Sequence, residues 1–317
     1  DLPTVFDMIE GLRYLYRFFI AMLPDIPKAH IYHSSAAAFC GLTCIIAKKK
    51  YGSKFLLTEH GVYIREQYLA ASRNQTPFRT KEFLMGLITL VAKLNFHFAD
   101  VVSPVCDYNS RWEIKWGVNK DKIQTIYNGI DTNVFKQFDV VKENDRPIVV
   151  MVARIDPLKD IETFIRTAQL VAEEIPDVLF KLYGPILDEK YYKHCQDLAH
   201  DLKIEKNFEF AGLTSSPQTA YNEGDVVMLT SISEAFPFVV IEAMACEKVV
   251  VSSDVGGTKE VLEGFGYVIR PKDYQGFYEK VTYLLKNPEI RREMGVDARE
   301  SILNGFTTED MVDNYSI

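Results

Sequence analysis

The chain has 317 residues, 47% of them hydrophobic, which suffices for two domains that each bury a core. Its formal net charge of −8 argues against nucleic acid as the main partner, and its apolar segments are too short or too charged to span a bilayer. Five cysteines, an odd number without metal-ligand spacing, indicate a reducing cytoplasm.

The first part of the chain predicts an irregular α/β domain. Helices are expected over residues 4–22, 36–50, 81–98 and 108–116, and strands over residues 30–33, 54–59, 101–103 and 122–127. Residues 136–146 are polar and charged, and we interpret them as a linker. The predicted domains are therefore 1–142 and 143–317.

From Pro147 the alternation of strands and helices is regular. Strands are expected over 147–153, 178–183, 207–212, 226–230, 249–252 and 267–270, and helices over 160–174, 189–202, 216–223, 238–246, 258–263 and 274–286. Two more helices are expected, over 288–303 and from residue 308. The alternation predicts a doubly wound parallel sheet, in which ligands bind outside the carboxyl ends of the strands.

Glu234 and Glu242 lie eight residues apart, with an aromatic-proline turn between them. That spacing corresponds to roughly 12 Å or more at ~1.5 Å per helical residue. It is too wide for a glycosidase acid/base pair, whose carboxyl groups lie about 5–9.5 Å apart. The spacing suits an elongated ligand held at both ends, and we assign Glu234 to a sugar and Glu242 to a ribose. The alternative is one surface glutamate and one on a helix face.

A helix is predicted to begin at Pro237, which fits the first helical position because its missing N–H group costs nothing there. The start of this helix would point backbone N–H groups and a positive dipole at a ligand. We expect the amides near Phe238, Val239 and Val240, after Phe236, to meet the diphosphate of a nucleotide-sugar.

Arg154 and Lys159 follow the first strand of the second domain. A guanidinium fork and an ammonium group at one strand end are suited to clamping phosphate. The alternative is a solvated loop in which Arg154 pairs with Asp156.

Four further strand ends carry weaker signals. Gly184 and Leu213 follow successive strands and are interpreted as a wall for the nucleobase, with ordinary turn chemistry as the alternative. The turn over residues 254–260 contains two glycines, which allow close backbone approach. His60 ends a predicted strand and is assigned to the reacting centre of the sugar, although a lone histidine is more often structural.

These residues resemble those of the family-4 retaining glycosyltransferases with the GT-B fold. The resemblance rests on Glu234 and Glu242, on Arg154 and Lys159, and on the Asn-Gly-Ile-Asp segment at 128–131. The Thr-Glu-His-Gly segment at 58–61 is similar to the PelF-type branch, the transferases of Pel exopolysaccharide synthesis. The similarity extends over roughly residues 12–315.

The resemblance implies two Rossmann-like domains facing a cleft, with the donor in the C-terminal one. It implies a UDP-sugar donor, UDP-glucose or a relative, and transfer of its hexose with retention to a growing exopolysaccharide. Arg154 and Lys159 would stabilise the leaving UDP, Glu234 would hold the sugar, and His60 would contact it. It also implies that no metal or other cofactor is needed, and a cytoplasmic protein, at the inner face of the membrane in a polysaccharide synthesis complex.

The sequence departs from the family pattern in two places. Cys246-Glu247 replaces the usual Ala-Gly after the helix that holds Glu242. The family's first strand and Gly-rich loop have no counterpart, and the chain begins without Met, so we expect an incomplete N-terminal domain. Two alternatives stay open for the function: a non-catalytic nucleotide-sugar-binding subunit or fragment, and a UDP-sugar epimerase on the same fold.

Overall fold

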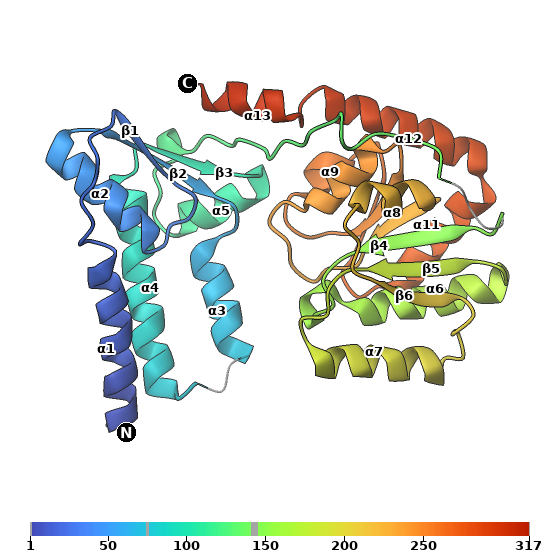
Figure 1. The fold of residues 1–317 in the computed structure, drawn as a ribbon, viewed down its shortest axis with the longest axis horizontal. Helices are drawn as coiled ribbons and strands as arrows, with labels where there is room; N and C mark the ends of the chain where they lie inside the picture. The colour runs from blue at the N-terminus through green and yellow to red at the C-terminus, as the bar shows by residue number, and fades with distance from the viewer. Residues whose placement is uncertain (1, 74–75, 141–144, 317) are drawn as a thin grey trace. The chain divides into compact units, whose positions relative to one another are not determined.

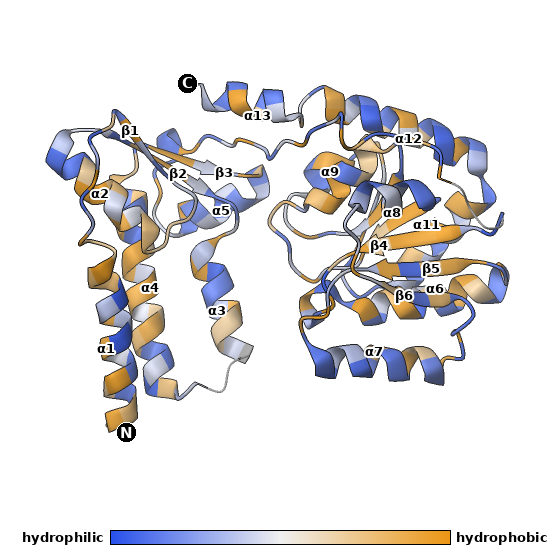
Figure 2. Ribbon diagram, viewed as in Figure 1, coloured by the Kyte–Doolittle hydropathy of each residue, from blue (hydrophilic) through white to orange (hydrophobic). Residues whose placement is uncertain are grey.

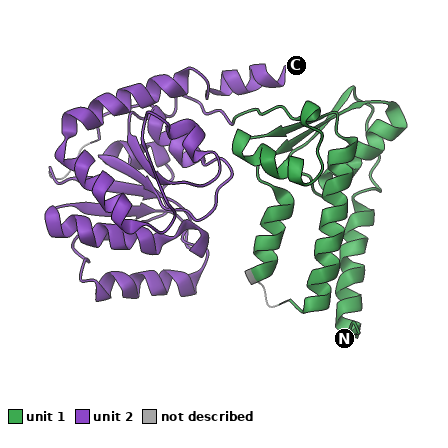
Figure 3. Ribbon diagram, turned by 180° about the vertical axis from the view of Figure 1, so that it is seen from behind, with its two compact units in different colours: residues 1–127 green, residues 128–317 purple. Residues whose placement is uncertain are grey.

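The chain forms two compact units, residues 1–127 and 128–317 (Figure 3). The computed structural model describes residues 2–73, 76–140 and 145–316 (Figure 1). The division falls earlier than the predicted one at 142/143, because Ile130 already bonds within the second unit, exchanging backbone hydrogen bonds with Phe306 and Thr308. Residues 141–144 of the predicted linker lie outside the described residues.

Unit 1 is an α/β unit around a three-stranded parallel sheet of order β1-β2-β3. Its strands are β1 (Ile31–Ser34), β2 (Lys54–Glu59) and β3 (Val101–Pro104). Its helices are α1 (Val5–Ile20), α2 (Cys40–Tyr51), α3 (Tyr63–Arg73), α4 (Phe78–Phe98) and α5 (Asp107–Lys115), followed by a short 3₁₀ helix, η1 (Lys120–Lys122).

The core of unit 1 joins the sheet to helix α4. Phe55 and Leu57 of β2 and Val102 of β3 pack with Ala92 and Phe96 of α4, and all five are buried. Helix α4 presents successive buried residues to the sheet as its periodicity requires. Short loops connect the carboxyl end of β2 to α3 and the carboxyl end of β3 to α5.

Two predictions for unit 1 differ from the structure. The segment predicted as a strand over 122–127 forms only an isolated bridge between Ile123 and Val102, because η1 occupies its first residue and only Gln124 and Ile126 donate backbone bonds to the β3 segment. Helix α3 was not predicted. Its eleven residues mix tyrosine, isoleucine, leucine and alanine with five polar residues, so it is less hydrophobic overall than α4.

Unit 2 is a doubly wound six-stranded parallel sheet of order β6-β5-β4-β7-β8-β9. The strands are β4 (Ile148–Val152), β5 (Leu179–Tyr183), β6 (Phe208–Gly212), β7 (Val226–Leu229), β8 (Val249–Ser253) and β9 (Tyr267–Ile269). The helices are η2 (Pro157–Lys159), α6 (Ile161–Glu174), α7 (Glu189–Asp201), α8 (Pro217–Glu223), α9 (Phe238–Ala245), α10 (Thr258–Leu262), α11 (Tyr274–Lys286), α12 (Pro288–Leu303) and α13 (Thr308–Tyr315). Every element predicted for this unit is present, with ends within two residues.

Both faces of the unit 2 sheet are covered. Val149 and Met151 of β4 belong to a cluster with buried residues of α6 and α11, whereas Ile148 and Val150 belong to a cluster with Ala220 of α8. This period of two is expected for a strand buried on both sides. Figure 2 shows β4 mostly apolar and the outer helix α7 mostly polar.

Candidate functional site

The strand order of unit 2 reverses between β4 and β7. From β4 the chain moves outward to β5 and β6, then returns and continues on the other side through β7, β8 and β9. The crevice beyond such a switch point is where open α/β sheets bind ligands. The loop after β4 carries Arg154 and Lys159, and the loop after β7 carries Glu234. Three of the predicted residues thus flank this point.

Lys159 and Glu234 form an ion pair. The Lys159 Nζ lies 2.5 Å from Glu234 Oε1, and the two side chains are only 16% and 15% exposed. The two loops are also tied through the backbone. Ile232 N–H donates to the Leu158 carbonyl over 2.8 Å, and the Thr230 hydroxyl donates to the carbonyl of Lys159 over 2.9 Å. Hydrogen bonds between the two loops therefore hold the Lys159–Glu234 ion pair in a mostly buried position.

Arg154 is the more exposed cation of the loop after β4. Its side chain is 54% exposed and lies 3.5 Å from a carboxylate oxygen of Asp156. The other Asp156 oxygen accepts the Leu158 N–H over 2.8 Å and caps η2. The Arg154–Asp156 pair of the alternative interpretation is therefore present, and Asp156 also shapes the turn that carries Lys159.

The Gly-rich turn packs against the backbone of the Glu234 loop. Gly256 has a φ of 57°, and a Cβ atom there would lie 2.3 Å from the Ala235 carbonyl oxygen and 2.5 Å from that of Glu234. Gly257 N–H donates to the Ala235 carbonyl over 2.8 Å. This turn therefore positions Glu234, a role that the sequence alone did not assign to it.

Helix α9 begins at Phe238, as the predicted range of 238–246 has it, and only the helical position of Pro237 differs from the prediction. Pro237 is its N-cap residue rather than its first helical residue, and Phe238 is the first. Phe236 and Pro237 are buried, and Phe236 stacks on Phe306 with ring centres 6.0 Å apart. Of the three amides expected near the diphosphate, Val240 N–H donates to the Pro237 carbonyl over 3.1 Å. By helix geometry the N–H groups of Phe238 and Val239 have no intrahelical acceptor.

Glu242 has an internal partner. Its Oε2 accepts a hydrogen bond from the hydroxyl of Tyr221 over 2.6 Å, and the Tyr221 side chain is fully buried. Burial raises the pKa of Glu242, and the Tyr221 hydrogen bond opposes this rise. Among the described residues, no hydrogen bond is found to the second carboxylate oxygen of Glu242. The hydrogen bond from Tyr221 therefore fixes the orientation of the Glu242 side chain on α9.

Gly184 and Leu213 follow β5 and β6, on one side of the switch point. Gly184 N–H donates to the Gly212 carbonyl over 2.9 Å, and a Cβ atom on Gly184 would lie 1.9 Å from the Ala153 carbonyl oxygen. Turn chemistry therefore explains Gly184 by itself. Leu213 is 77% exposed and presents an open apolar surface.

His60 belongs to unit 1, whereas the other predicted site residues belong to unit 2. It is exposed and lies between β2 and α3. The preceding residue, Glu59, is fully buried and accepts the backbone N–H groups of Ala37 over 2.5 Å and Tyr63 over 3.2 Å. Sequence reasoning missed Glu59, although a carboxylate at the end of a buried strand was a visible signal. It anchors both sides of the turn that presents His60.

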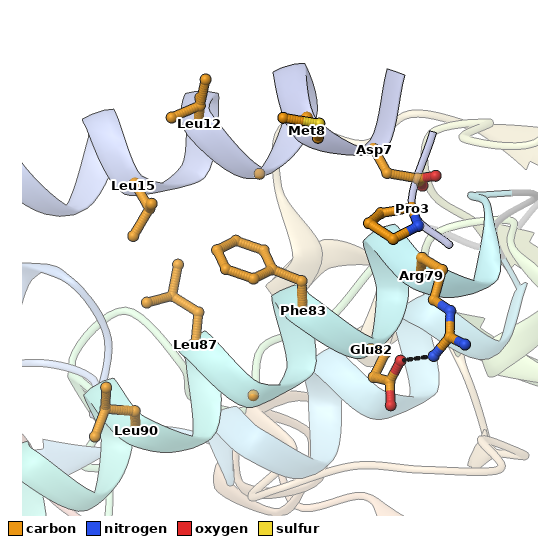
Figure 4. Close-up of a pocket in the computed structure, with 12 residues that line it drawn as sticks. Pro3, Asp7, Met8, Leu12, Leu15, Arg79, Glu82, Phe83, Leu87 and Leu90 are labelled. Carbon is orange, nitrogen blue, oxygen red and sulfur yellow. Dashed lines mark hydrogen bonds and ion pairs between the residues drawn. The ribbon is translucent and has the colours of Figure 1, made fainter. Parts of the chain in front are cut away.

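A large cavity lies elsewhere in unit 1. It has a volume of about 1000 Å³ and lies between α1 and α4, and it is lined mainly by apolar side chains such as Leu12, Phe83 and Leu90 (Figure 4). None of the predicted site residues lines it. In the described ranges no helix is long and apolar enough to cross a membrane, and no group of three or more His, Cys, Asp or Glu residues could hold a metal ion.

Comparison with known protein families identifies the family of this chain. Residues 133–301, which include the switch point of unit 2, match the family "Glycosyl transferases group 1". The chain belongs to the group 1 glycosyl transferases. Residues 3–121 of this glycosyl transferase match a second family, a domain of unknown function, DUF3492.

Curated relatives of this glycosyl transferase include two enzymes with different products. It is 28% identical over 245 residues to a trehalose synthase of Pyrococcus horikoshii, covering 74% of this chain and 58% of the relative. It is 27% identical over 310 residues to an N-acetyl-alpha-D-glucosaminyl L-malate synthase of Bacillus anthracis, covering 93% of this chain and 75% of that protein. The chain thus spans little more than half of the trehalose synthase.

Among solved structures, Anabaena HepE in complex with UDP has a similar fold. Its TM-score is 0.77 at 18% identity, over 96% of this chain and 80% of HepE. This similarity confirms the GT-B fold, with parallel sheets in two Rossmann-like domains, that the sequence resemblance implied.

Proposed function

We propose that this chain is a retaining hexosyltransferase that uses a UDP-sugar donor. The observation that carries the proposal is the Lys159–Glu234 pair at the switch point of unit 2, which places a cation and a hydrogen-bond-accepting carboxylate side by side. A UDP-sugar presents a negative diphosphate next to sugar hydroxyls. Lys159 offers a cation for the diphosphate, and Glu234 offers a hydrogen-bond acceptor for the sugar hydroxyls.

The roles of the residues follow from their charges. Lys159 and Arg154 stabilise the charge that develops on the diphosphate as the bond between the anomeric carbon and the phosphate oxygen breaks. Glu234 leaves Lys159 and accepts hydrogen bonds from the sugar hydroxyls. The N–H groups of Phe238 and Val239 meet the diphosphate at the start of α9. Two cations and a helix start supply the charge stabilisation, so we propose a reaction without a metal ion or cofactor.

The other predicted residues complete the donor site in this proposal. Glu242, oriented by Tyr221, binds the ribose through its second oxygen. Gly184 and the exposed Leu213 lie beside the nucleobase. His60 contacts the donor sugar. The acceptor hydroxyl attacks the anomeric carbon on the face from which UDP leaves, and its proton passes to the leaving diphosphate.

The biological setting is a further part of the proposal. The Thr58–Gly61 segment supports a PelF-type transferase that extends an exopolysaccharide in the cytoplasm, at the inner face of the membrane. HepE has been solved with UDP and with UDP-glucose, which supports a UDP-glucose-like donor.

The first prediction tests the donor site directly. Lys159→Ala and Glu234→Ala should each lower UDP-sugar turnover at least ~100-fold, since each removes a group aimed at the reacting centre. The measurement is UDP release from UDP-glucose and related donors. Lys193→Ala is the matched control, because Lys193 is 69% exposed on α7 and pairs only with Asp197.

Substitution of one partner leaves the other half-buried and unpaired, so folding must be checked by circular dichroism. Unchanged kinetics in both folded variants would sink the donor-site assignment. UDP binding by calorimetry without turnover would instead favour the non-catalytic binding subunit.

A further inference from the structure

Three cations surround one indole ring on unit 1. We call Arg65 of α3 and Tyr108, Arg111, Trp112 and Lys115 of α5 the cation–aromatic cluster. The Arg111 guanidinium carbon lies 3.5 Å from the centre of the Tyr108 ring and 5.7 Å from that of Trp112. Arg65 lies 5.8 Å and the Lys115 ammonium 4.9 Å from the Trp112 ring centre. Arg111 and Lys115 are exposed, and the two rings are half-buried.

Within the described residues no close ion pair neutralises the cations of the cluster. Glu66 follows Arg65 in sequence. Burial raises the pKa of Glu66, the charge of Arg65 opposes this rise, and no ion pair joins the two among the described residues. Glu113 of α5 is fully buried, and Asp107 accepts a hydrogen bond from Thr125. In a chain of net charge −8, this patch stands out as locally positive.

The two helices that carry the cluster start at the same edge of the unit 1 sheet. Helix α3 follows β2 and helix α5 follows β3, so both begin at the carboxyl edge of the unit 1 sheet. Open parallel sheets bind ligands beyond this edge. The same edge carries His60, which the proposed function places at the donor sugar.

We propose that the cation–aromatic cluster binds the acceptor, and that the acceptor is an anionic glycan chain. The proposal rests on the transferase function given above. Aromatic faces such as Tyr108 and Trp112 pack against the apolar faces of sugar rings. The arginine forks match carboxylate and phosphate groups, and either could supply the negative charge of the glycan. A neutral glycan would leave the three cations without a counter-charge.

The tryptophans of the chain allow binding at this place to be observed directly. The chain has two tryptophans, Trp112 in the cluster and Trp116 one turn later on the same segment. We expect tetragalacturonate, or an oligomer of glycerol phosphate, to change the tryptophan fluorescence in a saturable way. The two probes distinguish a carboxylate-bearing from a phosphate-bearing glycan. Maltotetraose, which is neutral, should bind at least ~10-fold more weakly than the better anionic probe.

Variants localise the binding. Arg65→Gln combined with Arg111→Gln should raise the dissociation constant of the better anionic probe at least ~10-fold, because each removes charge-assisted hydrogen bonds. Arg17→Gln is the matched control, because this exposed arginine also lies over a tyrosine ring, that of Tyr14 on α1, at 5.5 Å. It should change the constant less than ~2-fold. Equal binding of maltotetraose, absence of a fluorescence change with both anionic probes, or an unaltered constant in the double variant would overturn the proposal.

UDP calorimetry on the same protein separates this proposal from the donor assignment. UDP binding without anionic glycan binding contradicts only the acceptor inference. Anionic glycan binding without UDP binding supports the cluster as a glycan site and contradicts the proposed donor.

Discussion

At the scale of single residues, the contacts of the proposed donor site restrict the positions of its side chains. Glu234 is fixed by its ion pair with Lys159 and by the backbone of the Gly256–Gly257 turn. An ion pair with both side chains about 15% exposed depends on geometry, because the loss of solvation must be offset by close contact. A ligand that replaces either partner must therefore offer comparable hydrogen bonds.

Gly256 provides a test of this positioning. Gly256→Ala should destabilise unit 2 by about 1–3 kcal/mol, because alanine is strained at a φ of 57° and its Cβ would lie 2.3 Å from the Ala235 carbonyl oxygen. Gly264→Ala is the matched control, since Gly264 has a φ of 89° and no atom within 4 Å of the position its Cβ would take. Urea denaturation should show the larger loss for Gly256→Ala. An equal loss of unfolding free energy in the two variants would mean that the Gly256 turn and the Glu234 loop move apart without loss of stability.

At the scale of elements, the carboxyl end of β2 joins three segments of unit 1. Glu59 accepts backbone N–H groups from the segment before α2 and from the start of α3. Nearby, Glu113 of α5 is fully buried, and neither of its carboxyl oxygens has a hydrogen-bond partner among the described residues. Burial and the neighbouring Glu59 raise the pKa of Glu113 to about 8. Glu113 is therefore neutral at pH 7, because an unpaired buried carboxylate is costly.

Glu113 contributes to the pH dependence of stability together with Glu59, whose pKa burial also raises to about 8. Because the pKa of Glu113 is raised from 4.5 to about 8 on folding, the folded chain binds the proton more tightly than the unfolded chain. This contribution is fully present below pH 4.5 and is lost as the pH rises towards 8, by up to about 1.4 kcal/mol per pH unit. Glu113→Gln, which mimics the neutral acid, should flatten this fall.

Denaturation of unit 1, followed by tryptophan fluorescence between pH 5 and pH 8.5, measures the effect. Glu82→Gln serves as the control, because the Glu82 side chain is 59% exposed and pairs with Arg79 at the surface. A wild-type slope that Glu113→Gln leaves unaltered would contradict the assignment of the titration to Glu113.

At the scale of the whole molecule, the two units have separate cores. Among the described residues, the buried cluster around Phe164 and Phe180 lies in unit 2, and the buried clusters around Phe55 and Leu42 lie in unit 1. The proposed donor residues other than His60 lie in unit 2. A nucleotide that binds them should stabilise this unit by mass action.

Thermal unfolding with and without UDP checks this division of roles. At 100 times its dissociation constant, UDP should add about 2.7 kcal/mol to the stability of the unit that binds it. The calorimetric transition of unit 2 should therefore move to higher temperature. The tryptophan signal, which arises only from unit 1, should move less. Equal shifts in both signals would show that the nucleotide couples the units.

The sequence by itself determined most elements and the chemical groups at the strand ends. In unit 2 the hydrophobic runs and turn residues predicted all six strands, because the signals for a buried strand and for its turn are local. The same signals were misleading for the segment 122–127, which forms one isolated bridge instead of a strand. They also did not reveal helix α3. The spacing of Glu234 and Glu242 predicted an elongated ligand before any partner of either was known.

Only the tertiary structure decided which groups meet. Lys159 and Glu234 are 75 residues apart in sequence, and they pair because β4 lies next to β7 in the sheet. The order of strands depends on how the crossover helices pack, and a strand's own residues do not encode its neighbours. The partners of Glu59, the unpaired state of Glu113 and the gathering of Arg65 with Arg111 around Trp112 depend likewise on contacts between distant segments.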